Sequence, residues 1–199
     1  MAAIELSDIA AGMGGFVING ECAGDVAGWS VAGAGDVNGD GLTDLIVGAP
    51  SYFGSGRAAG HSYVVFGKTG SSAIDLTTIA AGSGGFVINA QCADDLNGFS
   101  VSAAGDLNGD GLADLMIGAY KSDPLAGNNA GRSYVVFGKS DGSAIELSTI
   151  ADGSGGFVIN GQWGGEYSGS SVAGIGDVNG DGVADLIVGA PLFNRSYVV

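Results

Sequence analysis

One unit of about 70 residues occurs three times in this chain, and this repetition constrains the fold more than any other feature. The nonamer DVNGDGLTD at residues 36–44 returns as DLNGDGLAD at 106–114 and as DVNGDGVAD at 177–185. Two further segments recur in register, GFVIN at 15–19, 85–89 and 156–160, and SYVV at 62–65, 133–136 and 196–199. We therefore treat residues 1–199 as a single domain with repeats at approximately 1–70, 71–140 and 141–199.

The composition excludes several classes of protein. Glycine makes up 40 of the 199 residues, but with only 3 prolines and no Gly-X-Y period the chain cannot form a collagen helix. Hydrophobic residues reach 46%, which argues against disorder. The formal charge of −15 would repel phosphate backbones, so we expect no nucleic-acid partner. No apolar run approaches the ~20 residues that a membrane-spanning helix needs, so we expect no membrane span.

Each repeat is predicted to form four short β-strands. In the first cycle they cover residues 30–35, 45–49, 62–66 and 86–89, which are β-branched and aromatic runs bounded by Gly, Asn, Asp or Ser. Helix is expected only as a single turn at residues 74–79. Four-stranded antiparallel units repeated radially are the plan of an all-β fold, the β-propeller, whose first strand in each blade lies nearest the central channel. A β-solenoid is the rival fold, but its rungs are usually shorter than this repeat.

The chain is out of phase with its blades. It opens on a strand of the fourth type at residues 16–19 and stops after a strand of the third type. We predict that the N-terminal strand acts as the outer strand of another blade, because the last blade lacks its own. Three blades are too few for the usual ring of about four to eight. The partial propeller is therefore either a fragment of a larger ring or half of a homodimer that closes a six-bladed ring by strand exchange.

The acidic nonamers are predicted to bind calcium. Each presents side-chain oxygens at positions 1, 3, 5 and 9 and a backbone carbonyl at position 7, with glycine at positions 4 and 6. Hard oxygen ligands in a flexible loop favour Ca²⁺ over Mg²⁺, which demands tighter octahedral geometry. One such nonamer could be a solvated turn, but three at the same spacing argue against that reading. The expected ligands of three Ca²⁺ per chain are Asp36, Asn38, Asp40, Leu42 (carbonyl), Asp44, Asp106, Asn108, Asp110, Leu112 (carbonyl), Asp114, Asp177, Asn179, Asp181, Val183 (carbonyl) and Asp185.

Other known calcium loops differ from these. An EF-hand needs an acid at position 12 and flanking helices, whereas position 12 here is Val47, Ile117 or Val188 inside a predicted strand. The dockerin loop begins with the same Asp-Val-Asn-Gly-Asp-Gly sequence and is excluded for the same reason. The tandem glycine-rich nonapeptides of RTX proteins are missing as well.

The sequence resembles the FG-GAP repeat of integrin α-subunit β-propellers and their bacterial relatives over essentially its whole length. The motifs that carry the resemblance are GWSV at 28–31, GFSV at 98–101, GSSV at 169–172, GAP at 48–50, GAY at 118–120 and GAP at 189–191. The chain departs from the family at Ala27, Asn97 and Ser168, which replace an aromatic residue, and at Tyr120, which replaces a proline. The resemblance implies a propeller ring with calcium in its blade loops and a role in adhesion or ligand binding.

The two faces of the predicted propeller have different roles. The acidic loops join first and second strands on one face, where a local loop would ligate each ion fully, so we expect calcium to be structural. The connections between second and third strands lie on the opposite face and differ among the repeats. These are either tolerant surface loops or a recognition surface. The candidate ligand-binding residues of this face are Tyr52, Phe53, Arg57, Lys121, Asn128, Asn129 and Trp163.

Two aligned sets of charged residues belong to the same face and predict ion pairs at the blade edges. The basic set is His61, Arg132 and Arg195. The acidic set is Asp25, Asp95 and Glu166.

We expect a calcium-binding module for adhesion or ligand recognition, outside the cell or on its surface, with an extracellular protein or a glycan as ligand. The alternatives are a lectin-like propeller, the propeller portion of a secreted hydrolase or lyase, and an assembly scaffold or engineered fragment without ligand. The sequence has one histidine and no Cys–His pair, Walker lysine or Gly-x-Ser-x-Gly elbow, so we do not expect an enzyme. Residues 1–20 lack the basic segment of a signal peptide, so any export signal is expected to lie outside this sequence.

Overall fold

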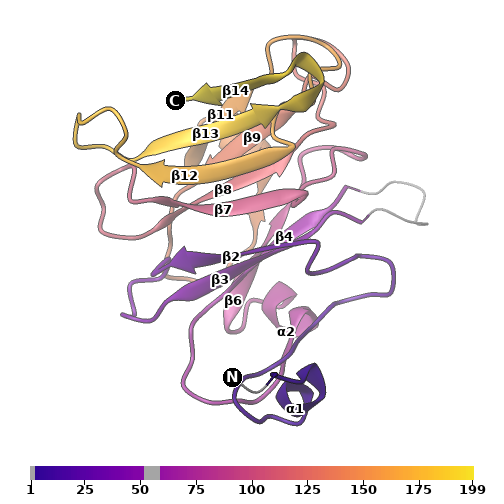
Figure 1. The fold of residues 1–199 in the computed structure, drawn as a ribbon, viewed down its shortest axis with the longest axis vertical. Helices are drawn as coiled ribbons and strands as arrows, with labels where there is room; N and C mark the ends of the chain where they lie inside the picture. Colours follow the sequence, from indigo (N-terminus) through magenta and orange to yellow (C-terminus); the bar gives the residue numbers. More distant parts are fainter. Residues whose placement is uncertain (1–2, 52–58) are drawn as a thin grey trace.

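Three large antiparallel sheets, here called blades 1 to 3, follow one another along the long axis of the molecule in sequence order (Figure 1). The computed structural model describes residues 3–51 and 59–199. Blade 1 contains β2 (Ser30–Gly35), β3 (Asp44–Ala49), β4 (His61–Val65) and β6 (Gly85–Asn89). Blade 2 contains β7 (Ser100–Gly105), β8 (Asp114–Ala119), β9 (Arg132–Val136) and β11 (Gly156–Asn160). Blade 3 contains β12 (Ser171–Gly176), β13 (Asp185–Ala190) and β14 (Arg195–Val198).

The strands of the three blades confirm the all-β prediction and lie within about one residue of their expected bounds. The N-terminal strand expected at residues 16–19 is shorter and covers only Ile18–Asn19. Helix is limited to three five-residue turns, α1 (Leu6–Ala10), α2 (Leu76–Ala80) and α3 (Leu147–Ala151), and to a 3₁₀ turn at Pro191–Phe193 before β14. Within the described residues, none of these helices is long and apolar enough to cross a membrane.

Short parallel pairs, which the sequence patterns did not predict, join each repeat to the one before it. The strand β10 (Ile145–Glu146), just before α3, pairs with the outer strand β6 of blade 1. The strand β5 (Ile74–Asp75) pairs in the same register with β1 (Ile18–Asn19). A side-chain hydrogen bond supports each pair, from Asn89 Nδ2 to Glu146 Oε1 at 2.6 Å and from Asn19 Nδ2 to Asp75 Oδ1 at 2.7 Å. The strand β1 is therefore the partner of β5 in the same way that β6 is the partner of β10.

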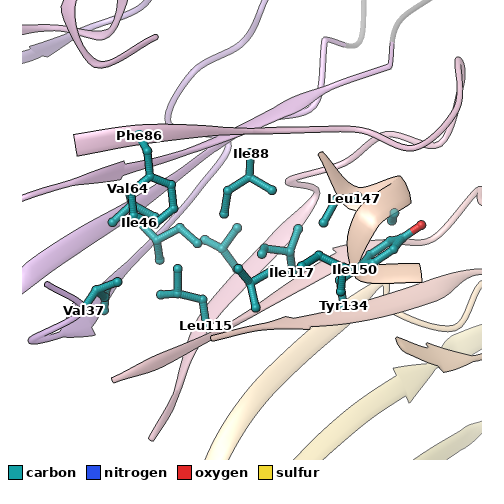
Figure 2. Packing of buried hydrophobic residues seen from close by; sticks show 14 residues of the cluster. Val37, Ile46, Val64, Phe86, Ile88, Leu115, Ile117, Tyr134, Leu147 and Ile150 are labelled. Atoms are coloured by element: carbon teal, nitrogen blue, oxygen red, sulfur yellow. The ribbon is translucent and has the colours of Figure 1, made fainter. Parts of the chain in front are cut away.

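The hydrophobic core lies between the blades. Figure 2 shows Ile46, Val64 and Phe86 of blade 1 facing Leu115 and Ile117 of blade 2, all fully buried. The helical turn α3 closes one end of this cluster with two further buried side chains, Leu147 and Ile150. A second cluster between blades 2 and 3 repeats the arrangement. Since each fully buried aliphatic side chain is worth about 1.5–3 kcal/mol, packing of one blade on the next supplies most of the cohesion.

Glycines at two equivalent positions let neighbouring blades approach at the level of the backbone. A Cβ atom added at Gly48 would overlap the carbonyl oxygen of Gly98 in the next repeat, and one at Gly118 would overlap the carbonyl oxygen of Gly169. The hydroxyl of Ser30 donates to the same Gly98 oxygen at 2.8 Å, as that of Ser100 does to Gly169. These contacts explain why glycine recurs in the Gly-Ala-Pro and Gly-x-Ser-Val segments.

Gly118→Ala should lower the free energy of unfolding by about 1–3 kcal/mol or more, because the new methyl group meets backbone that cannot move independently. The matched control is Gly189→Ala, at the same strand position of blade 3, where an added Cβ would have its nearest neighbour at 3.4 Å. That control should stay within about 0.5 kcal/mol of the parent. Urea unfolding of both variants provides the measurement, and equal losses would contradict the role given to the close approach.

Candidate functional site

The three acidic loops share one conformation, built by short side-chain to backbone hydrogen bonds. In the first loop Asp36 Oδ1 accepts from the amides of Gly39 and Asp40 at 2.8 and 3.1 Å, and Asp36 Oδ2 accepts from Gly41 at 2.8 Å. Asn38 Oδ1 accepts from the Asp40 amide at 2.9 Å. Asp106 and Asp177 make the equivalent bonds in the other loops. The glycines at positions 4 and 6 adopt positive φ in all three loops, which is why glycine is required there.

The aspartate at position 9 ties each of the first two loops to the rest of its blade. Asp44 is fully buried, and its two carboxylate oxygens accept from the amides of Val37 at 2.8 Å and of Gly67 at 2.7 Å. Asp114 makes the same two bonds, to Leu107 at 2.7 Å and to Gly138 at 2.9 Å. These bonds fasten the start of the loop to the segment that follows the third strand.

In the third loop, position 9 makes different contacts. Asp185 accepts from the backbone amides of Val178 and Asn179 and from the Asn179 side chain at 3.1 Å. The contacts of Asp185 thus lie within its own loop.

Burial raises the pKa of Asp44 and Asp114 above the ordinary value of an aspartate, and the nearby carboxylates of the same loop raise it further. The backbone amide donors act in the opposite direction. The first two loops thus concentrate carboxylates around a buried one whose charge two amides compensate only in part.

The donor set fits a hard divalent cation, since the loop offers carboxylate, amide and carbonyl oxygens and no nitrogen or sulfur ligand. A cation would also offset the cost of burying the position-9 carboxylate. In the described part of the chain, no group of three or more His, Cys, Asp or Glu side chains is arranged to hold a metal ion. The oxygens instead point at backbone amides, so the residues suit the ion chemically while the loop is held by its own hydrogen bonds.

Replacing Asp114 by alanine in calcium-free buffer should lower the unfolding free energy by about 2–4 kcal/mol, because two partly buried backbone amides lose their acceptor. Asp110→Ala is the matched control in the same loop, where the side chain is exposed and accepts from Leu112. We expect that control to cost at most about 1 kcal/mol. Chemical denaturation with chelator present separates the two, and similar losses would show that position 9 has no structural role beyond metal binding.

The opposite face brings together the described members of the predicted ligand-binding set. The amide of Gly165 donates to the carbonyl of Asn128 at 2.9 Å, and that of Tyr167 donates to Asn129 at 3.1 Å. The connection between β8 and β9 therefore lies directly against the connection between β11 and β12, which carries the half-exposed Trp163. Lys121 is half-buried at the start of the first connection. Tyr52, Phe53 and Arg57 lie outside the described residues.

A row of four aromatic side chains crosses this face, and the sequence reasoning missed it. The ring centroids of Trp29 and Phe99 are 5.5 Å apart, those of Phe99 and Tyr120 are 4.4 Å apart, and those of Tyr120 and Tyr167 are 5.5 Å apart. The row links all three repeats, with Trp29 half exposed at one end. Trp29 and Phe99 precede the inner strands, so the row lies at the ends of the strands opposite the acidic loops. The sequence did contain a signal for this row. Trp29 and Phe99 follow the glycine that opens the Gly-x-Ser-Val motif, and Tyr120 stands where the family has proline.

The predicted blade-edge ion pairs are wrong. Among the described residues the one ion pair joins Lys139 to Asp141 at 2.8 Å. The three aligned acids instead accept from backbone amides of their own loops, Asp25 from Cys22, Asp95 from Cys92, and Glu166 from Gln162 and Trp163. A local amide donor three or four residues away competes successfully with a cation held on a long side chain.

Comparison with known proteins agrees with this architecture. The model of the FG-GAP repeat matches residues 27–65, 93–136 and 168–199. Human integrin alpha-11 is 34% identical over 168 residues, which are 78% of this chain and 12% of that protein. Drosophila melanogaster integrin alpha-PS5 is 34% identical over 185 residues, 92% of this chain and 16% of that protein. Bovine phosphatidylinositol-glycan-specific phospholipase D is 31% identical over 173 residues, 82% of this chain and 18% of that protein.

The chain thus spans less than a fifth of the length of each of these relatives. The three family matches coincide with the inner strand, acidic loop, second strand and third strand of each blade. Together they cover more than half of the chain, which therefore belongs to the FG-GAP repeat family.

Proposed function

We propose that this chain is a calcium-stabilised β-propeller module that recognises an extracellular ligand through the face opposite its acidic loops. The observation that carries the proposal is the division between the two faces. One face holds the same acidic loop three times with nearly the same hydrogen bonds, as a scaffold does. The other carries the aromatic row and the loops that differ among repeats, as a binding surface does. Relatives named as integrin alpha subunits support a role in adhesion or recognition.

Calcium is proposed as a structural ion, one in each loop. The ligands would be the side chains at loop positions 1, 3, 5 and 9 with the carbonyl at position 7, in the sets that begin at Asp36, Asp106 and Asp177. When bound, the ion would supply positive charge among carboxylates that otherwise repel one another. The loop would then be fixed between the first and second strands of each blade, which is a contribution to stability rather than to chemistry.

Calcium should raise the melting temperature of the protein. A site that binds only the folded state stabilises it by about 2.7 kcal/mol when the free ion is at about 100 times its dissociation constant. For a domain of this size that corresponds to a shift of at least about 5 °C. Thermal unfolding with excess chelator, with calcium restored and with magnesium instead measures the effect, and an unchanged melt in chelator would contradict it.

One variant connects this stabilisation to a loop. Asp40→Asn keeps an oxygen that can accept from the Leu42 amide, as Asp40 Oδ1 does at 2.8 Å, but removes a charge that would face the ion. The melting temperature in chelator should therefore stay close to that of the parent, while the gain on adding calcium shrinks. Asp152→Asn, which removes an exposed carboxylate outside the loops, is the control and should leave the gain unchanged.

Carbohydrate is the second candidate class of ligand, because Trp29 and Trp163 are both half exposed on the recognition face. An aromatic ring at a surface offers an apolar platform at low entropic cost, which suits a sugar ring as well as a peptide side chain. The polar groups of Asn128 and Asn129 lie in the adjoining loop. A lectin-like module would use the same face as an adhesion module, so the two differ in ligand class and not in site.

A non-catalytic role is favoured over the hydrolase or lyase alternative. The single histidine, His61, has its Nδ1 atom 3.1 Å from the side-chain oxygen of Asn89 rather than beside a nucleophile. The relative named as a phospholipase D shares with this chain only 18% of its own length, so its activity is a property of the whole protein. An assembly scaffold without ligand is the remaining alternative. Because the proposed ligand is extracellular, the proposal places the protein outside the cell or at its surface.

Substituting the recognition face should abolish ligand capture without destabilising the blades. Trp29→Ala and Trp163→Ala should each weaken binding to the ligand found on a glycan and matrix-protein array about 30-fold, since aromatic anchors contribute about 2 kcal/mol or more. The control, Val178→Ala, removes a similarly exposed apolar side chain from the acidic-loop face. Array signal and melting temperature are read together, and binding that survives both tryptophan substitutions would place the ligand elsewhere.

A further inference from the structure

We propose that Lys68 and Ser72 form a binding site for the carboxylate of a peptide ligand, at a position that the second repeat fills with its own Asp141. The site lies in the connection between the third and fourth strands of blade 1, away from the aromatic row, and does not depend on the recognition role proposed above. The evidence is an internal comparison of two equivalent loops, residues 67–76 and 138–147.

The two loops hold a lysine side chain in the same way. Lys139 Nζ donates to the carbonyl oxygen and to the hydroxyl of Ser143 at 2.5 and 2.6 Å, and lies 5.1 Å from the centroid of an aromatic ring. Lys68 Nζ donates to the same two oxygens of Ser72 and lies 4.7 Å from a ring centroid. Each ammonium is thus fixed by two acceptors and one ring face, which leaves its third N–H group for a further acceptor. These two lysines belong to only six basic residues in a chain with a formal charge of −15.

In the second repeat a carboxylate takes this remaining position. Asp141 Oδ1 lies 2.8 Å from Lys139 Nζ, and it accepts from the Ser143 amide at 2.8 Å and from the Ser143 hydroxyl. These donors hold the pKa of Asp141 well below its ordinary value, and the hydrogen bond from the lysine ammonium contributes most. Three converging donors, one of them charged, therefore stabilise an anion at this point of the loop.

The first repeat has the same donors without the carboxylate. Gly70 stands where the second repeat has Asp141. Within the described residues, Lys68 forms no ion pair and the Ser72 amide donates to no acceptor. The ammonium, the hydroxyl and the amide that bind an aspartate in one loop are thus available to an external carboxylate in the other.

The preceding segment of the chain contacts both loops in the same way. Phe16 lies under the ammonium of the first loop as Phe86 lies under that of the second. Gly12 lies against the first loop as Gly82 lies against the second. The open donors of the first loop therefore result from Gly70 and not from a missing neighbour.

A pocket beside Lys68 determines what else the ligand must carry. The pocket has a volume of about 330 Å³, and Phe66, Ile74 and Ile79 supply its apolar wall. Asp75 also lines it, and its negative charge disfavours a dianion such as phosphate. The pocket thus suits a ligand with one negative charge and a short apolar group, since small-molecule sites combine an apolar wall with a few polar groups.

An acidic peptide side chain next to an apolar residue matches both parts of the site. The group that the second repeat places on its own donors is an aspartate of a peptide loop, so the donor geometry already accepts this side chain. The neighbouring apolar residue would enter the pocket. The smallest suitable probe is the capped dipeptide acetyl-Asp-Phe-amide.

Amide NMR of the full chain tests the site. Acetyl-Asp-Phe-amide should shift the backbone resonance of Ser72. Acetyl-Asn-Phe-amide, which lacks the charge, and acetyl-Asp-Gly-amide, which lacks the apolar group, should each bind at least about 10-fold more weakly. No shift of Ser72, or equal affinities for the first two peptides, would overturn the carboxylate site. Equal affinity for the glycine peptide would overturn the role of the pocket, and tighter binding of 3-phenylpropionate, a free acid, would overturn the assignment to a peptide.

Variants of the two loops provide the matched control. Asp141→Gly gives the second loop the residue of the first, so the acidic peptide should then shift Ser143 as well as Ser72, a gain that damage to the fold cannot produce. Lys68→Gln should weaken binding at Ser72 at least about 10-fold. Arg195→Gln, which removes an exposed positive charge from blade 3, should leave it unchanged. An unresponsive Ser143 in the Asp141→Gly protein, or full binding after Lys68→Gln, would overturn the proposal.

Discussion

The close approach of neighbouring blades at glycine is the contact on which the rest of the structure depends. Gly48 and Gly118 leave room for the carbonyl oxygens of Gly98 and Gly169, and a serine hydroxyl from the earlier blade completes each contact. With the backbones this close, Ile46 and Leu115 pack between the sheets in one buried cluster (Figure 2). A side chain at the glycine position would separate the blades and open the core that holds them together.

This constraint explains the family motif in physical terms. Each contact joins a glycine near the end of the second strand, such as Gly48, to a glycine just before the inner strand of the following repeat, such as Gly98. The close approach therefore requires both glycines. Gly98 needs its own lack of a side chain, because an added Cβ would overlap the carbonyl oxygen of His61, and it also adopts a φ of 82°. Gly33 has no such neighbour, and its counterpart in the second repeat is Ala103. Glycine thus persists where backbones meet and is replaced where they do not.

Patterns local to the sequence predicted the strands, the helical turns and the position of the acidic loops. They could do so because β-branched runs such as residues 62–65 and turn residues such as Gly39 and Gly41 determine local conformation with little help from tertiary contacts. Contacts between repeats were not predictable in this way. The parallel pair of β5 with β1 is two residues long, and the aromatic row depends on Tyr120 and Phe99 meeting across a blade boundary. Charge alone misled the reasoning at Glu166, because residue type does not reveal that nearby backbone amides already satisfy the carboxylate.

The same separation between local and inter-repeat contacts determines where new function can arise. Most hydrogen bonds of the acidic loops stay within one repeat, including the tie to Gly67 or Gly138 in the same blade, and between the first two loops the Ala113 amide donates to the Asp36 carbonyl at 2.9 Å. The opposite face is assembled across repeats, since Trp29, Phe99 and Tyr167 come from three of them. A change in one repeat there alters the shared surface while leaving the hydrogen bonds within the acidic loops intact. Recognition can therefore diverge on that face without altering the acidic loops, which is the physical reason to place the proposed ligand opposite them.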